Sequence, residues 1–456
     1  MMRYPLKAAL LTAILLGTAP LSHAMGPFQV YELALRNDPT YLGALKERDA
    51  GLENRIIGRA GLLPRVSYNY NKGRNDSKAT LKGGREDTTD HRHYNSFGSS
   101  LTIQQPLIDY EAYANYRKGL AQALFADETF RSKSQELLVR VLTLYTQALF
   151  AQDQISIARA KQQAFERQFA QNRQMFQQGE GTRTDILEAE SRNELAIAEQ
   201  IEASDEQDAA LRELAALLGE PGIDVAQLDP LKDSFQALVL APSSFTEWHA
   251  LAAANSPILA SQRQAVEVAR YDVERNRAGH LPTVNAFASI RQNESDSGNT
   301  YNQRYDTNTV GIEVSLPLYA GGGTSASVRQ ANSKREQAEY ELEGKTRETL
   351  IELRRQFNAC ASGVSKLRAY QKALVSAQAL VESTRQSILG GERISLDALN
   401  AEQQLYSTRR DLAKARYDYL MAWIKLHYYA GTLRDTDLAR IDEAFVLARD
   451  GRDRQR

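Results

Sequence analysis

Residues 390–433 read GGERISLDALNAEQQLYSTRRDLAKARYDYLMAWIKLHYYAGTL, and a second version of this stretch lies 212 residues earlier in the chain. The two copies align without a gap, and the identical pairs include Gly179/Gly391, Glu180/Glu392, Asp185/Asp397, Leu187/Leu399, Ala189/Ala401, Glu190/Glu402, Leu214/Leu426 and Gly219/Gly431. Each copy is typical of a turn followed by a long helix. Self-similarity at a fixed offset indicates that the chain consists of two halves built on one plan.

The start of each copy carries the residues that a turn and a helix N-terminus need. The glycine supplies backbone freedom at the turn. We predict that Thr184 or Ser395 caps the following helix with its hydroxyl group. Asp185 or Asp397 places a carboxylate near the helix N-terminus, where the helix dipole stabilises it.

A second repeated block lies near the start of each half, with an offset of 218 residues. Its identical pairs are Leu33/Leu251, Ala34/Ala252, Asn37/Asn255, Pro39/Pro257, Arg59/Arg277, Ala60/Ala278, Gly61/Gly279, Leu63/Leu281, Pro64/Pro282 and Val66/Val284. The spacing predicts a helix over 31–62 and another over 248–280, each ended by a Gly-x-Leu-Pro element that restarts the chain as an extended segment. We therefore predict a first structural repeat at 25–228 and a second at 229–434.

Residues 1–24 have the features of a secretory signal peptide. Arg3 and Lys7 give a basic start, residues 10–16 an apolar core, and residues 22–24 a small-residue cleavage site. The apolar core is too short to span a bilayer as a helix. The chain is therefore expected to be exported.

Composition limits the classes of function that remain. The formal net charge is -1 over 456 residues and becomes about -3 once the basic signal segment is removed, so no basic field attracts nucleic acid. Cys360 is the only cysteine, which excludes an intrachain disulfide, and no cysteine lies at the cleavage point to carry a lipid. No later run of 18 apolar residues appears, so membrane insertion would require strands.

Four segments alternate apolar and polar residues with the period of a strand. They predict one hairpin at 65–105 and another at 283–316, with strands of about ten residues, long enough to cross an outer membrane when tilted. One face of each strand would be apolar and the other polar. The polar links 75–94 and 291–304 are expected to be exposed loops.

Each hairpin is followed by a long helical pattern. Residues 111–178 and 325–389 contain no proline, and their apolar residues recur at spacings of three and four, near the coiled-coil period. About 65 residues of helix make a rod of roughly 100 Å. The rod turns at the repeated glycine and a second helix returns. The charged segment 435–456 is expected to be a disordered tail.

Four strands per chain are too few to close a barrel, and an open edge in lipid would leave backbone groups without hydrogen bonds. Copies of the chain must therefore associate. Two copies would give about eight strands, whose interior side chains can fill, whereas three would give about twelve strands and leave a channel. We predict a cyclic homotrimer with a continuous bore, extended by a tube of coiled-coil helices.

These features resemble the TolC family of outer-membrane channel-tunnels over nearly the whole mature chain. The motifs that carry the resemblance are Asn37-Asp38-Pro39, Leu62-Leu63-Pro64, Pro317-Leu318-Tyr319 with Gly321-Gly322, Gly391-x-Arg393, Asp397-x-Leu399, Leu412-Ala413-x-Ala415-Arg416-Tyr417-x-Tyr419-Leu420 and Gly431-Thr432-Leu433. Within the family the chain is most similar to members that serve type I secretion, especially the outer-membrane component for alkaline metalloprotease export.

The resemblance implies a mainly helical fold with a β-barrel part. Three chains would form a 12-stranded barrel in the bacterial outer membrane and a 12-helix periplasmic tunnel. It also implies three partners: an inner-membrane ABC transporter that spends the ATP, a periplasmic adaptor (membrane fusion) protein, and an exported polypeptide in transit. Outer-membrane lipid would surround the barrel.

The family's tunnel closes at its periplasmic end through contacts near the repeated turns, and the resemblance carries this gate onto specific positions. The implied gate residues are Thr184, Asp185, Arg393, Asp397 and Asn400, with Gly179 and Gly391 as the turn glycines. Asn400 stands where the family has a second aspartate, which implies three carboxylates per trimer at the constriction. Ile388 stands where the family has a tyrosine, which implies one fewer gate hydrogen bond.

Other motifs favour ordinary structural roles. Residues 90–93, Asp-His-Arg-His, lack the further ligands of a metal site, and residues 320–327, AGGGTSAS, lack the ending of a phosphate loop. We interpret the second stretch as a strand-to-helix turn capped by Thr324 or Ser325. No constellation of catalytic residues stands out, so we predict no catalysis and no cofactor.

Three functions are compatible with the sequence. The first is an exit duct for a polypeptide delivered by an ABC transporter. The second is the outlet of a multidrug efflux pump, which would use the same fold. The third, of a different class, is a structural coiled-coil rod on the cell surface, which the two amphipathic hairpins disfavour.

Overall fold

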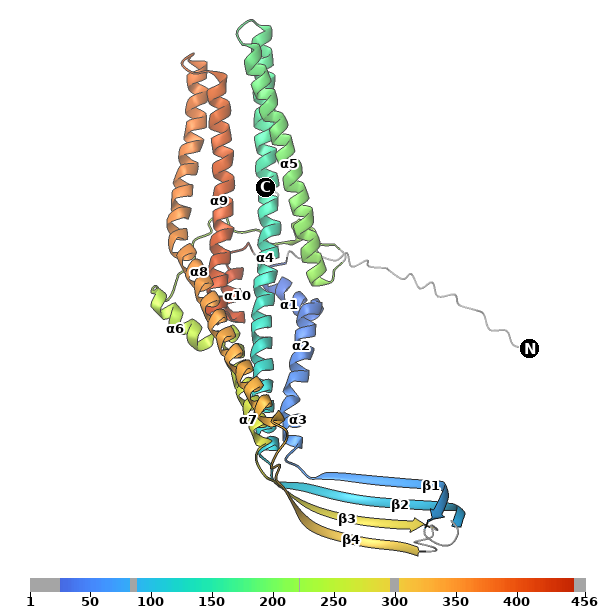
Figure 1. The fold of residues 1–456 in the computed structure, drawn as a ribbon. Helices are drawn as coiled ribbons and strands as arrows, with labels where there is room; N and C mark the ends of the chain where they lie inside the picture. Colours follow the sequence, from blue (N-terminus) through green and yellow to red (C-terminus); the bar gives the residue numbers. More distant parts are fainter. Residues whose placement is uncertain (1–24, 83–87, 221, 296–302, 447–456) are drawn as a thin grey trace, which may run out of the picture.

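A computed structural model describes residues 25–82, 88–220, 222–295 and 303–446. The chain forms an elongated molecule with a strand sheet at one end and long helices pointing away from it (Figure 1). In chain order the elements are α1 (Pro27–Asn37), α2 (Pro39–Leu52), α3 (Asn54–Ala60), β1 (Arg65–Leu81), β2 (Thr88–Ile108), α4 (Tyr110–Gln177), α5 (Arg183–Leu218), the 3₁₀ turn η1 (Val225–Gln227), α6 (Phe245–Asn255), α7 (Pro257–Ala278), β3 (Thr283–Ser295), β4 (Gln303–Ser315), α8 (Gly323–Leu389), α9 (Ser395–Ala430) and α10 (Asp435–Asp442).

The four strands form one antiparallel sheet in the order β1-β2-β3-β4. Its rows alternate in polarity across all four strands. One row is Val66, Ile103, Ala288 and Val310, and the next is Ser67, Thr102, Ser289 and Thr309. The sheet therefore has an apolar face and a polar face, as predicted. Val310 is 86% exposed and Ile312 69% exposed in the single chain, so the apolar face is uncovered.

The strands extend further than their apolar pattern indicated. They contain 17, 21, 13 and 13 residues, and β1 pairs with β2 as far as Leu81 opposite Thr88. The expectation that 75–94 and 291–304 are loops was therefore wrong for most of these residues; 83–87 and 296–302 lie outside the described residues. Backbone pairing continues beyond the apolar rows because a ladder needs no apolar side chains.

Two very long helices connect the sheet to the far tip of the molecule. α4 contains 68 residues and α8 contains 67, which corresponds to roughly 100 Å each, as predicted. α5 and α9 return from the tip and pack beside α4 and α8, while α7 lies between α4 and α8 near the sheet (Figure 1). None of the helices in the described ranges is both long and apolar enough to span a membrane.

The entry to α8 differs from the sequence prediction in its cap. The strand-to-helix turn at 320–322 is present, but neither Thr324 nor Ser325 caps the helix. Gly322, with φ of +79°, is the residue before the first helical position, and Gly321 has φ of +62°. Two successive residues in the left-handed region reverse the chain here, which explains the glycine-rich sequence.

The predicted first helix over 31–62 is divided into three. Asp38 separates α1 from α2, because Pro39 cannot continue the hydrogen-bond ladder, and Glu53 separates α2 from α3. Asp38 is 4% exposed; its carboxylate accepts a hydrogen bond from the Tyr41 backbone nitrogen (3.0 Å) and forms an ion pair with Arg140. The second half has the equivalent break at Ser256-Pro257, between α6 and α7.

Each half closes on itself where its early helix break meets its last helix. The Asn37 side-chain amide donates to the carbonyl oxygen of Leu218 at the end of α5 (2.7 Å). In the second half Gly431, with φ of +69°, lies so close to Asn255 that an added Cβ atom would be 2.3 Å from the Asn255 carbonyl oxygen. The repeated asparagine and the repeated glycine are therefore partners in space, which explains why both recur.

The main hydrophobic core lies at the waist of the molecule, where both halves meet. Its largest fully buried side chains include Trp248, Tyr145 and Phe445. Phe445 packs edge-on against Tyr145 with ring centroids 5.4 Å apart. The expectation of a disordered tail from residue 435 was therefore wrong as far as residue 446: α10 and Phe445 bury apolar side chains in this core, and 447–456 lie outside the described residues.

Candidate functional site

The candidate site is the tip where each long helix turns into its return helix. Both turns have the same geometry around a left-handed glycine, Gly179 (φ +81°) and Gly391 (φ +74°). In the first turn the Gly179 and Glu180 backbone nitrogens donate to the Phe176 and Met175 carbonyl oxygens (3.1 and 3.0 Å), and the second turn repeats this pattern at Gly391 and Glu392. This is the double hydrogen bond that ends a helix when a glycine follows it. Gly179 and Gly391 each lie in the left-handed region at the point where the chain reverses.

Asp185 is held in place by Thr182, a residue that the sequence pattern did not single out. The Asp185 carboxylate accepts hydrogen bonds from the Thr182 backbone nitrogen (3.0 Å) and hydroxyl group (2.6 Å), while the Thr182 hydroxyl accepts from the Asp185 backbone nitrogen (3.2 Å). This reciprocal arrangement is a capping box. The predicted cap at Thr184 was therefore wrong: Thr184 lies one position inside the helix with its side chain exposed.

Ser395 also has a different role from the predicted cap. The residue before α9 is Ile394, which has no capping oxygen, and Ser395 is the first helical residue. The Ser395 hydroxyl donates to the Asn172 side-chain oxygen (2.7 Å) and accepts from the Gln168 side-chain amide (2.9 Å). Asn172, which is 2% exposed, also donates to the backbone oxygen of Asp185 (2.9 Å). One polar cluster thus joins α4, α5 and α9 near the tip.

The predicted gate residues on α9 lie in different environments. Within the described part of the chain, the exposed Arg393 side chain forms no hydrogen bond or ion pair, and none joins it to Thr184 or Asp185. Asp397 is half-buried, and its backbone nitrogen donates a hydrogen bond to the carbonyl oxygen of Ile394 (3.0 Å). Asn400 accepts a hydrogen bond from Arg192 of α5 (3.0 Å). Arg192 also lies 3.7 Å from Glu188, which is the position equivalent to Asn400 in the first repeat.

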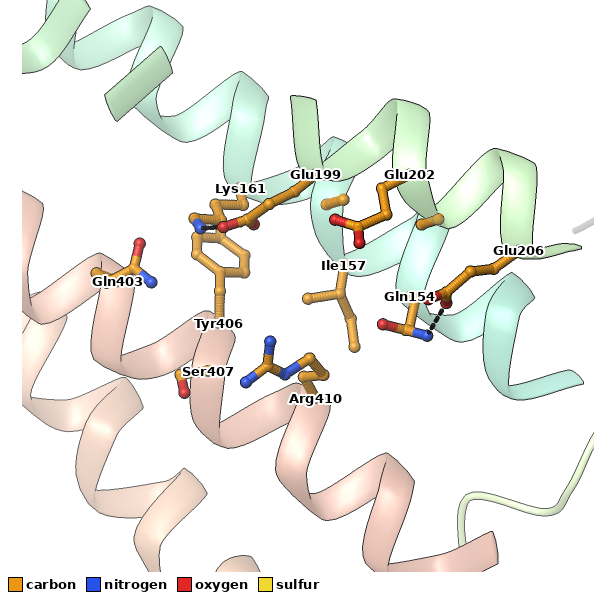
Figure 2. A pocket seen from close by; sticks show the side chains of 12 residues that line it. Gln154, Ile157, Lys161, Glu199, Glu202, Glu206, Gln403, Tyr406, Ser407 and Arg410 are labelled. Atoms are coloured by element: carbon orange, nitrogen blue, oxygen red, sulfur yellow. Dashed lines mark hydrogen bonds and ion pairs between the residues drawn. The ribbon is translucent and has the colours of Figure 1, made fainter. Parts of the chain in front are cut away.

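A polar groove continues from the tip toward the waist, between the α4/α5 pair and α9 (Figure 2). It encloses about 270 Å³. Lys161 is 5% exposed and its ammonium group contacts both carboxylate oxygens of Glu199 at 2.7 Å. Figure 2 shows a second contact along the same face, in which the Gln154 amide donates to Glu206 (2.9 Å). Here the two helix pairs are separated by charged and polar side chains instead of apolar ones.

Only a few contacts cross this groove. The Tyr406 hydroxyl of α9 donates to the backbone oxygen of Ala160 in α4 (3.0 Å). Burial, followed by the carboxylate of Glu402, raises the pKa of Tyr406, so the hydroxyl stays protonated as a donor. Glu402 is 4% exposed and pairs with Arg385 of α8 (2.6 Å), which holds α8 to α9. α4 packs more closely with α5, and α8 with α9, than either pair packs with the other.

The described residues contain no group of three or more His, Cys, Asp or Glu side chains that could hold a metal ion. Cys360 is buried in the core, and burial raises the pKa of its thiol to about 12, so it remains a neutral thiol. The charged side chains at the tip and in the groove act through hydrogen bonds and ion pairs between helices. The arrangement suits a structure whose helix pairs can move relative to each other.

Sequence reasoning missed Gln168, Asn172 and Ser395 as a cluster and Arg192 as the partner of Asn400. The signal that could have found them is the difference between the two copies. Ile394 stands opposite Thr182 and Ser395 opposite Arg183, so the second turn cannot use the first turn's cap. A serine that is not needed as a cap is available to bond to the neighbouring helix pair.

The sheet is amphipathic, its two outer edges have no partner strand in the described residues, and helices of roughly 100 Å continue it; this is the architecture expected of an outer-membrane channel with a periplasmic extension. A family model described as outer membrane efflux protein matches residues 30–220 and 248–432. The chain belongs to this family, and the resemblance to TolC-like channel-tunnels is confirmed.

Individual relatives agree with this assignment. The alkaline protease secretion protein AprF of Pseudomonas aeruginosa is 52% identical, over 93% of this chain and 88% of that protein. The proteases secretion protein PrtF of Dickeya chrysanthemi is 44% identical, over 97% and 96%. The open state of the Neisseria gonorrhoeae MtrE outer membrane channel has the same fold, with a TM-score of 0.75 at 19% identity, over 90% of each chain. The family and the fold are those of channel proteins.

Proposed function

We propose that this chain is the outer-membrane exit duct of a type I, ABC transporter-driven protein secretion system that exports an extracellular protease. The observation that carries the proposal is the similarity along nearly the whole chain to two protease secretion proteins. Three chains form the duct, with twelve strands in the outer membrane and twelve helices in the periplasmic tunnel. Its partners are an inner-membrane ABC transporter, a periplasmic adaptor protein and the exported polypeptide.

The duct is a passive conduit with no catalytic activity and no cofactor. The ABC transporter supplies the energy, and the duct supplies a water-filled path. The mature chain begins at Met25 after removal of a signal peptide, and the two repeats at 25–228 and 229–434 contribute one strand hairpin and one long helix pair each. The polar rows of the sheet support this interpretation, because a channel that carries a hydrated polypeptide needs a polar lining.

The tip of the helix pairs forms the gate. Arg393 and Thr184 have exposed side chains in the single chain, so both are available to a neighbouring subunit. Asp185 is oriented by Thr182, which fixes where its carboxylate can accept a further bond. Asp397 supplies three carboxylates per trimer, whereas Asn400 is occupied by Arg192 and adds no charge. The polar groove supports movement of α8 and α9, because water can replace polar contacts as the helices separate.

Deletion of the gene tests the substrate class. We expect the deletion strain to lose protease activity from the culture fluid and to recover it when the gene is restored on a plasmid. A plasmid carrying the related channel of an efflux pump serves as the control and should not restore release. Unchanged protease release together with new drug sensitivity would replace this proposal with the efflux-outlet function. If the chain were a structural surface rod, the deletion would change neither protease release nor drug sensitivity.

A further inference from the structure

The start of the described chain is fixed at the waist of the molecule by backbone pairing. Met25 forms a parallel bridge with Leu228, in which the Met25 nitrogen donates to Gln227 (2.5 Å) and the Asp229 nitrogen donates to the Met25 carbonyl oxygen (3.3 Å). The Tyr145 hydroxyl from α4 lies 2.9 Å from the same Met25 carbonyl oxygen and 2.9 Å from the backbone carbonyl oxygen of Asp229. Residue 25 is therefore held in one position against residues 227–229.

Two carboxylates from distant parts of the chain converge beside this segment. A Cβ atom added to Gly26 would lie 3.0 Å from an Asp442 carboxylate oxygen and 3.4 Å from an Asp229 carboxylate oxygen. Asp442 belongs to α10, and its carboxylate accepts a hydrogen bond from the Phe28 backbone nitrogen (3.2 Å) in the first turn of α1. Asp442 is therefore partly accounted for, since it caps a helix that lacks a cap of its own.

Asp229 has no such explanation. It is 3% exposed, yet within the described part of the chain its carboxylate accepts no hydrogen bond and joins no ion pair. Burial and then the Asp442 carboxylate raise the pKa of Asp229, and burial raises the pKa of Asp442 against the effect of the Phe28 hydrogen bond. No basic side chain lowers either pKa. Tyr145, Asp229 and Asp442 contact this segment, and the ammonium group of Lys232, three residues beyond Asp229, donates to the carbonyl oxygen of Glu443 (2.7 Å). A carboxylate that has lost most of its contact with water is stabilised by a nearby cation, so the site suits a positive group.

We propose that Asp229 and Asp442 bind the α-ammonium group that signal-peptide removal creates at Met25. Before cleavage the Met25 nitrogen is an uncharged amide that can donate only one hydrogen bond, already made to Gln227. Cleavage hydrolyses the bond between residues 24 and 25, and the new amine takes up a proton from water to become an ammonium group with three donors. One donor can keep the bond to the Gln227 carbonyl oxygen, which leaves two donors for the carboxylates that lie beside the neighbouring residue, Gly26.

This ion pair would connect maturation to the packing of the waist. The ammonium group joins the N-terminal end of α1, the linker at Asp229 and the C-terminal helix α10 at one point beside Tyr145 in the core. The precursor holds two close carboxylates without a cation, which opposes the closing of α10 onto α1. The mature chain removes that repulsion. We therefore expect the pair to form only after export and cleavage.

The test is the pKa of the α-amine in the mature trimer purified from outer membranes. Intact mass first establishes that the chain begins at Met25. The rate at which acetic anhydride acetylates the N-terminal peptide is then followed by mass spectrometry from about pH 6 to about pH 10, a range that brackets the ordinary α-amine pKa of about 7.7–8.0. The variants are Asp229→Asn and Asp442→Asn. The control is Glu443→Gln, which removes the same charge from an exposed side chain next to Asp442.

We expect the α-amine of the wild-type and Glu443→Gln proteins to titrate at least about one pH unit above the ordinary value, because opposite charges within about 4–6 Å shift a pKa by that amount or more. Each aspartate variant should lower it by about one unit. An ordinary α-amine pKa in the wild type overturns the proposal, even if a variant fails to assemble. A mature chain that begins elsewhere than Met25, or equal values in all four proteins, overturns it as well.

Discussion

At the scale of single residues, some polar side chains at the tip have hydrogen-bond partners within the chain, whereas Arg393 has none among the described residues. Thr182 fixes the carboxylate of Asp185 through two hydrogen bonds, and Arg192 occupies the side chain of Asn400. Arg393, by comparison, is exposed and has no partner in the described part of its own chain. An exposed arginine gains little from isolated pairs, so a function for Arg393 requires a second subunit that brings carboxylates to it.

Replacement of Arg393 tests this directly. We expect Arg393→Ser to raise single-channel conductance in planar bilayers, because in the proposed gate the guanidinium group binds a neighbouring subunit and its loss would weaken the closed state. The matched control is Arg173→Ser, which removes another exposed arginine of the tip region from α4. Equal conductance in wild type and Arg393→Ser would remove Arg393 from the gate.

His427 is a residue whose burial predicts a dependence of stability on pH. Its ring lies 4.1 Å from the Trp423 ring and 5.0 Å from the Trp248 ring, centroid to centroid. Burial lowers the pKa of His427 to about 4, with the Asp437 carboxylate opposing this effect and Arg440 adding to it. Between about pH 4 and about pH 6.5 the native state therefore holds a neutral histidine, whereas the unfolded chain holds a mostly protonated one.

The sign of the effect follows from the two pKa values. Between the unfolded value of about 6.5 and the folded value of about 4, the unfolded chain binds more protons, so stability falls as pH decreases through this window. We expect a loss of up to about 3 kcal/mol per chain between about pH 7 and about pH 4. Thermal unfolding of His427→Gln should lose this component of the acid sensitivity, whereas the exposed His249→Gln control should keep it. Identical pH profiles for wild type and His427→Gln would contradict the neutral buried state.

At the scale of elements, sequence reasoning located the long helices well and the strand ends poorly. α4 and α8 begin and end within two residues of their predicted bounds, because an uninterrupted apolar period over more than 60 residues has few alternatives. The strands exceed their apolar pattern because cross-strand backbone bonds continue through polar residues. α10 was missed because burial of Phe445 depends on Tyr145, which lies far away in the sequence.

At the candidate site, the positions of the two turns could be predicted from the sequence, but the side-chain hydrogen bonds between helices could not. The two turn glycines follow from local backbone geometry, which the sequence carries directly. The cap at Thr182 required a choice between two threonines two positions apart. The cluster of Gln168, Asn172 and Ser395 depends on how two helix pairs meet, and no local pattern encodes that.

Gly391 and Gly431 have similar backbone angles, but we predict that replacement by alanine destabilises the protein by different amounts at the two positions. Gly391→Ala meets no atom within 4 Å in the chain, so only the left-handed conformation opposes it, at about 1–2 kcal/mol. Gly431→Ala has the same conformational cost and would also place Cβ 2.3 Å from the Asn255 carbonyl oxygen. Overpacking adds about 1–3 kcal/mol.

Thermal unfolding of the two variants in detergent measures this difference. We expect Gly431→Ala to lower the melting temperature clearly more than Gly391→Ala does. Equal losses would mean that the contact between the end of α9 and the break before α7 is looser than the structure indicates.

At the scale of the whole molecule, the sheet of one chain does not close on itself in the described residues. β1 and β4 each have one edge without a partner strand in the described residues, and the apolar face beside them is exposed. In lipid each free backbone group costs several kcal/mol, so edges of 13–17 residues cannot remain open. The long helices point away from the sheet together (Figure 1), so closure of the sheet also arranges them as a tube.

Native mass spectrometry of the mature protein released from detergent micelles tests this assembly most directly. We predict a single species with the mass of three chains, in which three four-stranded sheets close one barrel. A folded species with the mass of one chain, stable in water after the detergent is removed, would contradict it.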